Sequence, residues 1–324
     1  MVLEASRKDL RGGGAGVNVF LTGASGFLGS RVLSRLLADG RRVAVLLRPS
    51  SDLWRISQNL DAVTPVMGDL KEPASYAEAL ARFEPDTLIH LAWWGVQNQH
   101  RDDSRQVANL GATLALLEKA AVSGVHHFIG LGSQAEYGPS KNVIDENAPT
   151  RPTTVYGVTK LATGLLSGQF CCRAGIRFAW LRIFSSYGAG DDPSWLIPST
   201  TLSLLRGERP ALTKGEQLWD FVHVDDVAAA ICAVADTAGA SGVFNVGSGT
   251  VATIRSIVEQ LRDLVTPGAP LGFGELPYRA DQVMHLQADI KRLTTATGWK
   301  PGISLAEGLQ QTVEWFREHR DRYN

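Results

Sequence analysis

The sequence has no long apolar run and almost no net charge. No apolar stretch approaches the roughly 20 residues that a membrane-spanning helix needs. The formal charge is −1 over 324 residues, with 20% charged residues, so a basic surface for nucleic acid or for anionic lipid is not expected. We therefore predict neither nucleic acid nor a membrane as a partner.

Cysteine and histidine are sparse and have no metal-binding spacing. Of three cysteines, Cys171 and Cys172 are adjacent and Cys232 is isolated, and the seven histidines form no H-E-x-x-H pattern. The sequence thus predicts no metal site and a reducing, cytoplasmic environment. A secretory leader is not apparent, because residues 1–16 combine basic residues with a glycine cluster. We expect residues 1–16 to be a flexible leader.

Apolar segments that end in glycine turns alternate with amphipathic segments along the first half of the chain. This alternation is typical of an α/β fold, a doubly wound parallel sheet (Rossmann) with helices on both faces. Strands are predicted at 17–23, 41–48, 86–93, 125–133 and 176–182, and helices at 27–40, 104–123 and 156–172.

After residue 182 the chain becomes rich in turns and in Gly and Pro. We predict a dinucleotide-binding domain at 17–182 plus 220–249, where GVFNVGSG (242–249) returns to the main sheet. Residues 183–219 plus 250–324 are expected to form a smaller C-terminal α/β substrate lobe.

The segment TGASGFLG places Gly23, Gly26 and Gly29 between the first strand and the first helix. Glycine lets the backbone turn sharply and approach a pyrophosphate closely, while the helix N-terminus offers free N–H groups. With a strand before it and a helix after it, this spacing indicates a dinucleotide site.

The end of the second strand bears on the identity of the dinucleotide. An acidic residue there binds a free ribose 2′-hydroxyl, whereas an arginine accommodates a 2′-phosphate. The chain has Arg48, and no acid follows before Asp52, which favours NADP(H) and leaves NAD(H) as the alternative. Asp69, in GDL (68–70), either accepts a hydrogen bond from the adenine or caps the next helix.

Two tyrosines compete for a chemical role. Tyr156 and Lys160 are four residues apart on a predicted helix, so the ammonium can ease ionisation of the phenol. Tyr137 has no such partner, because Gly138 and Pro139 forbid a helix there. Ser133 ends a strand, at the sheet edge that binds ligands. We predict Ser133, Tyr156 and Lys160 as the catalytic residues.

From Val17 onward the chain resembles the extended short-chain dehydrogenase/reductases, in the NAD-dependent epimerase/dehydratase family of nucleotide-sugar enzymes. The resemblance lies in TGASGFLG, GDL, HLAW, NLGAT, YGVTK, LRIFSSYGAG, WDFVHVDDVA, FNVGSG and EGLQQTVEW. It implies that Tyr156 is the general acid/base, that Lys160 anchors a ribose and that Ser133 holds the substrate oxygen. Two long helices, at 104–123 and 156–172, would form a homodimer.

The glycine turn and the resemblance together assign the remaining site residues. The cofactor residues are Gly23, Ser25, Gly26, Phe27, Leu28, Gly29, Arg48, Asp69, Leu70, Leu91, Ala92, Trp93 and Asn109, with Tyr156 and Lys160. The substrate is a nucleoside-diphosphate sugar, and its expected contacts are Trp94, Gln134, Ser185, Trp219 and Arg279, the last at a position that commonly holds the diphosphate.

Departures from the family pattern separate the possible reactions. Sugar-nucleotide 4,6-dehydratases carry an Asp-Glu pair after the hydroxyl residue, where this chain has Gln134 and Ala135, so dehydration is improbable. Glu136 is one residue off and, by strand alternation, is expected to face the opposite way. Ser185 stands where many relatives have Asn, and Trp219 where many have Arg.

Three functions stay open at this point. The first is NADPH-dependent reduction of the C4 ketone of a nucleoside-diphosphate 4-keto-6-deoxyhexose. Arg48 favours it, and so does the segment GSQAEYG, which is similar to that of nucleotide-sugar 4-ketoreductases such as abequose and paratose synthases. The alternative is an NAD-dependent nucleotide-sugar 4-epimerase. A non-catalytic NADP-binding regulator is disfavoured by the intact Ser133, Tyr156 and Lys160.

Overall fold

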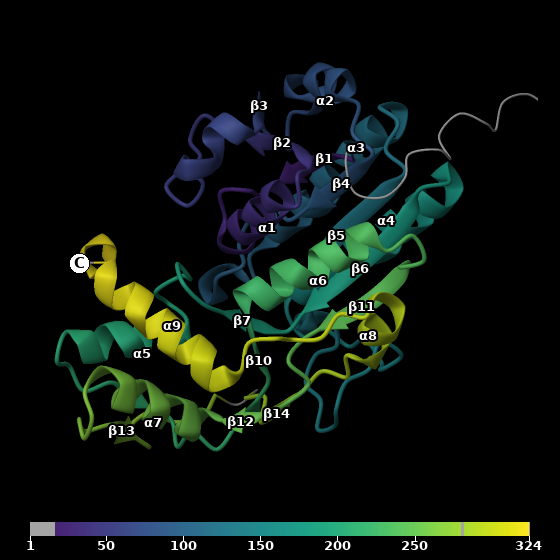
Figure 1. Ribbon diagram of the computed structural model, residues 1–324. Coiled ribbons are helices and arrows are strands. Elements are labelled where there is room, and N and C mark those ends of the chain that lie inside the picture. Colours follow the sequence, from purple (N-terminus) through teal and green to yellow (C-terminus); the bar gives the residue numbers. More distant parts are fainter. Residues whose placement is uncertain (1–16, 280–281, 324) are drawn as a thin grey trace, which may run out of the picture.

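Seven parallel strands form one sheet in the order β11-β6-β5-β4-β1-β2-β3 (Figure 1). The structure, a computed structural model, describes residues 17–279 and 282–323, so the predicted leader 1–16 lies outside the described residues. The strands are β1 Asn18–Thr22, β2 Arg42–Leu47, β3 Thr64–Met67, β4 Thr87–His90, β5 His127–Ser133, β6 Arg177–Ile183 and β11 Gly242–Val246.

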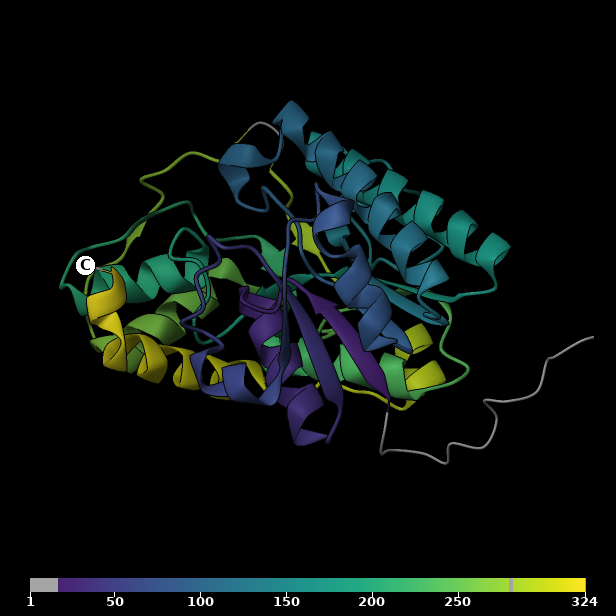
Figure 2. The same cartoon turned by 90° about the horizontal axis from the view of Figure 1, so that it is seen from above.

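Helices cover both faces of the sheet, as the sequence predicted. One face packs against α1 (Phe27–Ala38), α6 (Val224–Asp236) and α8 (Lys291–Thr297), the other against α2 (Ala77–Phe83), α3 (Val107–Val122) and α4 (Val155–Ala174) (Figure 2). Burial on both faces explains why strands such as VAVLL read as continuous apolar runs. The doubly wound fold is therefore confirmed.

The smaller lobe contains α5 (Leu196–Leu205), α7 (Ile254–Val265) and α9 (Leu305–Glu318) around their own apolar cluster. Its short strands are β7 Ser185–Tyr187, β8 Ala211–Leu212, β9 Leu218–Trp219, β12 Ala252–Thr253, β13 Gly272–Phe273 and β14 His285–Leu286. Strand β10 Phe221–His223 pairs with β7 and places Val222 in the core of the large domain.

One segment lies elsewhere than the predicted division placed it. Helix α8 falls within 250–324, yet its Leu293 and the following Trp299 are buried in the core of the large sheet. Trp299 also donates its indole N–H to the carbonyl of Asp226 on α6 (3.1 Å). The chain thus returns to the large domain before α9, a crossing that turn composition alone does not reveal.

The last helix also contacts the large domain. Trp315 on α9 stacks on Trp54, in the loop after β2, with ring centroids 6.0 Å apart. Arg55 lies over the Trp54 ring and donates to the carbonyl of Gly190 in the loop after β7 (2.8 Å from Nη2).

None of the described helices combines the length and apolarity needed to cross a bilayer.

Asp220, between β9 and β10, joins three segments. Its fully buried carboxylate accepts the backbone N–H groups of Ser248, Gly249 and Ala288 at 2.7–3.0 Å, and the Ser248 hydroxyl at 2.7 Å. Asp220 therefore holds the turn after β11 against the segment that contains Ala288. Each carboxylate oxygen already accepts two hydrogen bonds, so the carboxylate cannot accept another from a ligand.

We expect Asp220→Ala to lower the free energy of unfolding by roughly 3 kcal/mol, because it leaves three backbone donors without an acceptor in a largely buried place. Urea unfolding followed by circular dichroism measures the loss. Asp61→Ala, at an exposed position on a short 3-10 helix, is the control and should change the value by less than about 0.5 kcal/mol. Equal stability of the two variants would contradict this role.

Candidate active site

A cleft of about 590 Å³ opens at the carboxyl ends of β1, β2, β3 and β4. In a parallel doubly wound sheet this edge is where ligands bind. The lining includes nine of the residues predicted to bind cofactor or substrate. They are Gly23, Ser25, Arg48, Asp69, Leu70, Ala92, Trp93, Trp94 and Asn109.

The glycine turn has the geometry that a dinucleotide requires. Gly23 has φ +76°, and a Cβ built there would lie 2.7 Å from the backbone N of Ala92. A Cβ on Gly29 would lie 1.9 Å from the carbonyl oxygen of Gly23. Gly26 is exposed and begins α1 with no capping side chain, so the first N–H groups of the helix, at Phe27 and Leu28, face outward unblocked. These residues fit a dinucleotide pyrophosphate.

The outer end of the cleft is basic. Exposed Arg48 lies there with Ser51 and Lys71, and the Ser51 hydroxyl accepts the backbone N–H of Arg48 (3.0 Å). Asp69 accepts the backbone N–H of Lys71 through one carboxylate oxygen (2.9 Å). Two cations therefore surround the position at which other members of the fold hold a ribose.

The loop after β4 forms the inner wall of the cleft. Ala92 donates its N–H to the Thr22 hydroxyl (3.3 Å), while Leu91 packs into the sheet core. Asn109 on α3 accepts the N–H of Trp94 (2.9 Å) and donates to its carbonyl (3.1 Å). Asn109 thus holds this loop, and Trp94, expected at the substrate, lines the same cleft as Arg48.

Ser133, Tyr156 and Lys160 come together as predicted. Ser133 ends β5, its hydroxyl accepts the backbone N–H of Ala135 (3.2 Å), and it lies close enough to Tyr156 to lower the pKa of the phenol. Tyr156 and Lys160 lie on the buried face of α4, with exposed fractions of 6% and 4%, and the Lys160 Nζ is 5.9 Å from the Tyr156 ring centroid. Helix α4 begins at a Thr154 cap, whose hydroxyl accepts the N–H of Gly157 (3.1 Å).

The charge acting on the phenol comes from an unexpected residue. Burial raises the pKa of Tyr156, and the Arg101 guanidinium and the Ser133 hydroxyl oppose that rise. Burial also lowers the pKa of Lys160 to about 7, against the opposing charge of Glu136. Lys160 donates to the Leu131 carbonyl (2.7 Å) instead of the phenol. The phenol therefore feels mainly Arg101, where the helical spacing predicted Lys160.

Trp93 separates Lys160 from the cleft. The Lys160 ammonium lies 3.7 Å from the centroid of the Trp93 ring, whose edge meets Tyr156 with centroids 6.2 Å apart. The indole N–H of Trp93 donates to Gln106 on the approach to α3 (2.9 Å). The Trp93 ring thus contacts two of the three catalytic candidates, Tyr156 and Lys160, and lines the predicted cofactor cleft.

Glu136 faces the core, as expected, but for a different reason. Residues Gln134–Glu136 form a 3-10 turn, so strand alternation does not apply. The Glu136 carboxylate accepts the N–H of Ser133 (2.9 Å) and the indole N–H of Trp180 (3.0 Å), and it pairs with Arg182 (2.7 Å). Its bonding capacity is taken up by the fold.

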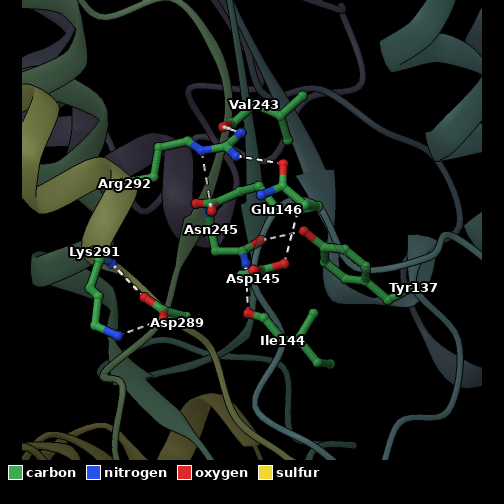
Figure 3. A network of polar contacts seen from close by, with 10 residues as sticks. Tyr137, Ile144, Asp145, Glu146, Val243, Asn245, Asp289, Lys291 and Arg292 are labelled. Carbon is green, nitrogen blue, oxygen red and sulfur yellow. Dashed lines mark hydrogen bonds and ion pairs between the residues drawn. The ribbon is translucent and has the colours of Figure 1, made fainter.

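Tyr137 is structural in this arrangement (Figure 3). Its hydroxyl donates to the side chain of Asn245 on β11 (2.7 Å), and Asn245 donates in turn to the carbonyl of Ile144 (2.9 Å). Glu146 accepts the backbone N–H of Asn245 (2.8 Å) and lies 3.5 Å from Arg292. The network fixes the loop after β5 to the edge strand of the sheet.

The predicted substrate residues are only partly assembled. The Trp219 indole donates to the Ser185 hydroxyl (2.6 Å), so these two departures from the family pattern contact each other. Gln134 is half-buried on the turn after Ser133, and Arg279 is exposed. Arg101 was not predicted, because the polar stretch QNQHRDDSRQ contains nothing that distinguishes it. Among the described residues, no group of three His, Cys, Asp or Glu could hold a metal ion.

Comparison with known proteins agrees with this geometry. The model of the "NAD dependent epimerase/dehydratase family" matches residues 19–247. A UDP-glucose 4-epimerase of Mycolicibacterium smegmatis is 29% identical, over 93% of this chain and 99% of its own. A dTDP-glucose 4,6-dehydratase of Streptomyces griseus is 28% identical, over 94% and 95%.

Among solved structures, a UDP-glucose 4-epimerase of Thermotoga maritima, determined with UDP-glucose, superposes with a TM-score of 0.84. It is 28% identical, and the match covers 94% of this chain and all of that one.

We expect Lys160→Met to be more stable than the wild type below pH 7 and to lose that advantage as the pH rises toward 10. The Lys160 pKa falls from 10.5 to about 7 on folding. Below pH 7 the native state therefore keeps a charged ammonium in the core, which lowers its free energy of unfolding. Between pH 7 and 10.5 the native state releases this proton while the unfolded state still holds it, so the wild type gains stability as the pH rises. Urea unfolding at pH 6, 8 and 10 measures the difference.

The exposed Lys300→Met variant is the control and should show no such trend. A Lys160→Met difference that is constant with pH would contradict the lowered pKa.

Proposed function

The chain belongs to the NAD-dependent epimerase/dehydratase family, within the short-chain dehydrogenase/reductases, and on that basis we propose that it is a nucleotide-sugar 4-epimerase. The observation that carries the proposal is the buried Tyr156 phenol, which lies beside Lys160 and whose pKa the Ser133 hydroxyl helps to lower. The epimerase relatives, matched along nearly their full length, support this reaction over ketoreduction.

The cofactor site in this proposal follows the cleft. Gly23, Ser25, Gly26, Phe27, Leu28 and Gly29 would hold the pyrophosphate, Asp69 and Leu70 the adenosine, and Leu91, Ala92, Trp93 and Asn109 the inner half. When bound, the dinucleotide supplies the acceptor that oxidises a secondary alcohol and the donor that reduces the ketone again.

The chain's own residues handle the proton. Tyr156 takes the proton of the sugar C4 hydroxyl during oxidation and returns it after the ketone has presented its other face. Ser133 holds the same oxygen through its hydroxyl. Arg101 lowers the cost of forming the phenolate, and Lys160, once Trp93 no longer covers it, would bind a ribose hydroxyl.

Dehydration is not supported, although dehydratases are among the relatives. Gln134 and Ala135 carry no proton to exchange, and the Glu136 carboxylate is bonded to Ser133, Trp180 and Arg182. No acid remains at this turn to protonate a leaving hydroxyl group.

NADPH-dependent 4-ketoreduction is the second candidate, and a specific observation favours it. Arg48 and Lys71 line the outer cleft at the position where NAD-specific relatives of this fold carry an acid. A 2′-phosphate would match these two cations. A reductase would consume NADPH with a nucleoside-diphosphate 4-keto-6-deoxyhexose, whereas an epimerase regenerates its cofactor in each cycle.

We also propose a homodimer through α3 and α4, which lie side by side (Figure 2). Their outer surface exposes apolar side chains that a second copy would cover: Val107, Val122, Val158, Leu165 and Leu166. The cytoplasmic location stays a prediction, consistent with the free thiols of all three cysteines.

We expect Tyr156→Phe to reduce the interconversion of UDP-glucose and UDP-galactose by about 10²- to 10⁴-fold, since the proton loses its carrier. NAD affinity, measured by calorimetry, should change less than about twofold. Tyr137→Phe is the matched control: it removes a buried hydroxyl bonded to Asn245, so it should cost roughly 1 kcal/mol of stability and keep turnover. Full activity of Tyr156→Phe would refute the assignment.

Arg48→Ala tests the choice of cofactor. If Arg48 pairs with a 2′-phosphate, the variant should bind NADPH at least about tenfold more weakly and NADH unchanged, because only the former carries that charge. Fluorescence titration gives both constants. Wild-type protein that binds NADH more tightly than NADPH would remove the case for the ketoreductase and leave the epimerase.

A further inference from the structure

Arg101 lies at the opening between the large domain and the smaller lobe. Its guanidinium carbon is 5.0 Å from the Tyr156 ring centroid and 5.5 Å from that of Trp195, the residue that precedes α5. Two aromatic rings from different parts of the fold therefore hold one cation beside the phenol.

The backbone fixes where this side chain starts. The Arg101 carbonyl accepts the N–H of Tyr156 (2.7 Å), and the neighbouring Asp102 carboxylate accepts the N–H of Val155 (3.2 Å). These bonds attach the loop to the first turn of α4, so the guanidinium keeps its position relative to Tyr156.

Arg101 forms no ion pair with a described residue, although the charge of the neighbouring Asp102 acts on it and raises its pKa. No carboxylate of the described residues lies within 4 Å of it, and its Nε donates to the carbonyl of Val96 (3.2 Å). Burial lowers the pKa of Arg101, and the positive charge of Arg279 lowers it further. The positive charges of the two arginines therefore repel each other, and an anion bound beside them would relieve that repulsion.

The smaller lobe lacks a cation at a position where one is common in the family. Trp219 occupies it, and its only polar group donates to Ser185 (2.6 Å). The diphosphate of a sugar nucleotide carries two or more negative charges, and the predicted contact Arg279 would supply one guanidinium to them. A second cation from another element would complete the compensation.

We propose that Arg101 is the second arginine of the substrate diphosphate site, acting with Arg279 in place of the missing cation at Trp219. The inference rests on the proposed function, because it takes the substrate to be a nucleoside-diphosphate sugar. The cofactor pyrophosphate is a different ligand: it belongs to the glycine turn, and Arg101 does not line that cleft.

The test measures binding of UDP, dTDP, uridine and thymidine to the full-length protein by isothermal titration calorimetry, in the wild type and in Arg101→Met. The variant keeps the backbone bond to Tyr156 and removes only the guanidinium. At least one diphosphate should bind the variant about tenfold to hundredfold more weakly, with the affinities for its nucleoside and for NAD unchanged. The diphosphate affinity of Arg101→Lys should lie between those of the wild type and Arg101→Met, since lysine keeps the positive charge but not the paired N–H donors of the guanidinium.

Arg82→Met, which removes an exposed arginine paired with Glu78 on α2, is the control and should bind as the wild type does. UDP lacks the hexose of a sugar nucleotide, so a loss of UDP affinity cannot come from contacts with that hexose. Unchanged diphosphate affinity in Arg101→Met, or a wild type that binds diphosphates no better than nucleosides, would overturn the proposal.

The two proposals can fail separately. Absence of turnover with any nucleotide sugar, together with Arg101-dependent UDP or dTDP binding, would reject the epimerase and retain this subsite. Normal epimerisation together with Arg101-independent binding would do the reverse.

Discussion

The buried carboxylate of Glu136 is the constraint on which the candidate site depends. It ties the end of β5 to β6 through Trp180 and Arg182, and it bonds the backbone of Ser133 directly. A carboxylate in an apolar core is stable only with such partners. Because all three contacts are made by one carboxylate, the backbone of Ser133 has a fixed position relative to α4. The negative charge of the same carboxylate also acts on Lys160 and raises its pKa, against the effect of burial.

The fold could be predicted from the sequence because its signals are local. Continuous apolar strands, the glycine turn and the spacing from Tyr156 to Lys160 each act within a few residues, and the sheet, α1 and α4 formed where expected. The position of α8 could not be predicted, since nothing in its sequence tells which apolar core receives Leu293.

The site was predicted in part, for the same reason. Ser133 and Tyr156 meet because one ends a strand and the other begins a helix at the same edge of the sheet. Arg101 was not predicted, because it acts through contacts with Tyr156 and Trp195, which lie 55 and 94 residues further along the chain, and its sequence surroundings are ordinary. Trp93 was predicted at the cofactor, but its contact with the Lys160 ammonium was not. The prediction that Glu136 faces away from the site was right, but the strand alternation on which it was based was not, because residues Gln134–Glu136 form a 3-10 turn. The site also gives two signals that favour different reactions: Arg48 and Lys71 make the outer cleft basic, whereas the relatives include UDP-glucose 4-epimerases.

The stacking of Trp54 on Trp315 links the chain's last helix to the loop that starts at Arg48. The rim of the nucleotide cleft is therefore buttressed by α9, a helix that is remote from it in the sequence. Neither Trp54 nor Trp315 lines the cleft itself. Loss of either ring would loosen the rim without removing any group that lines the cleft.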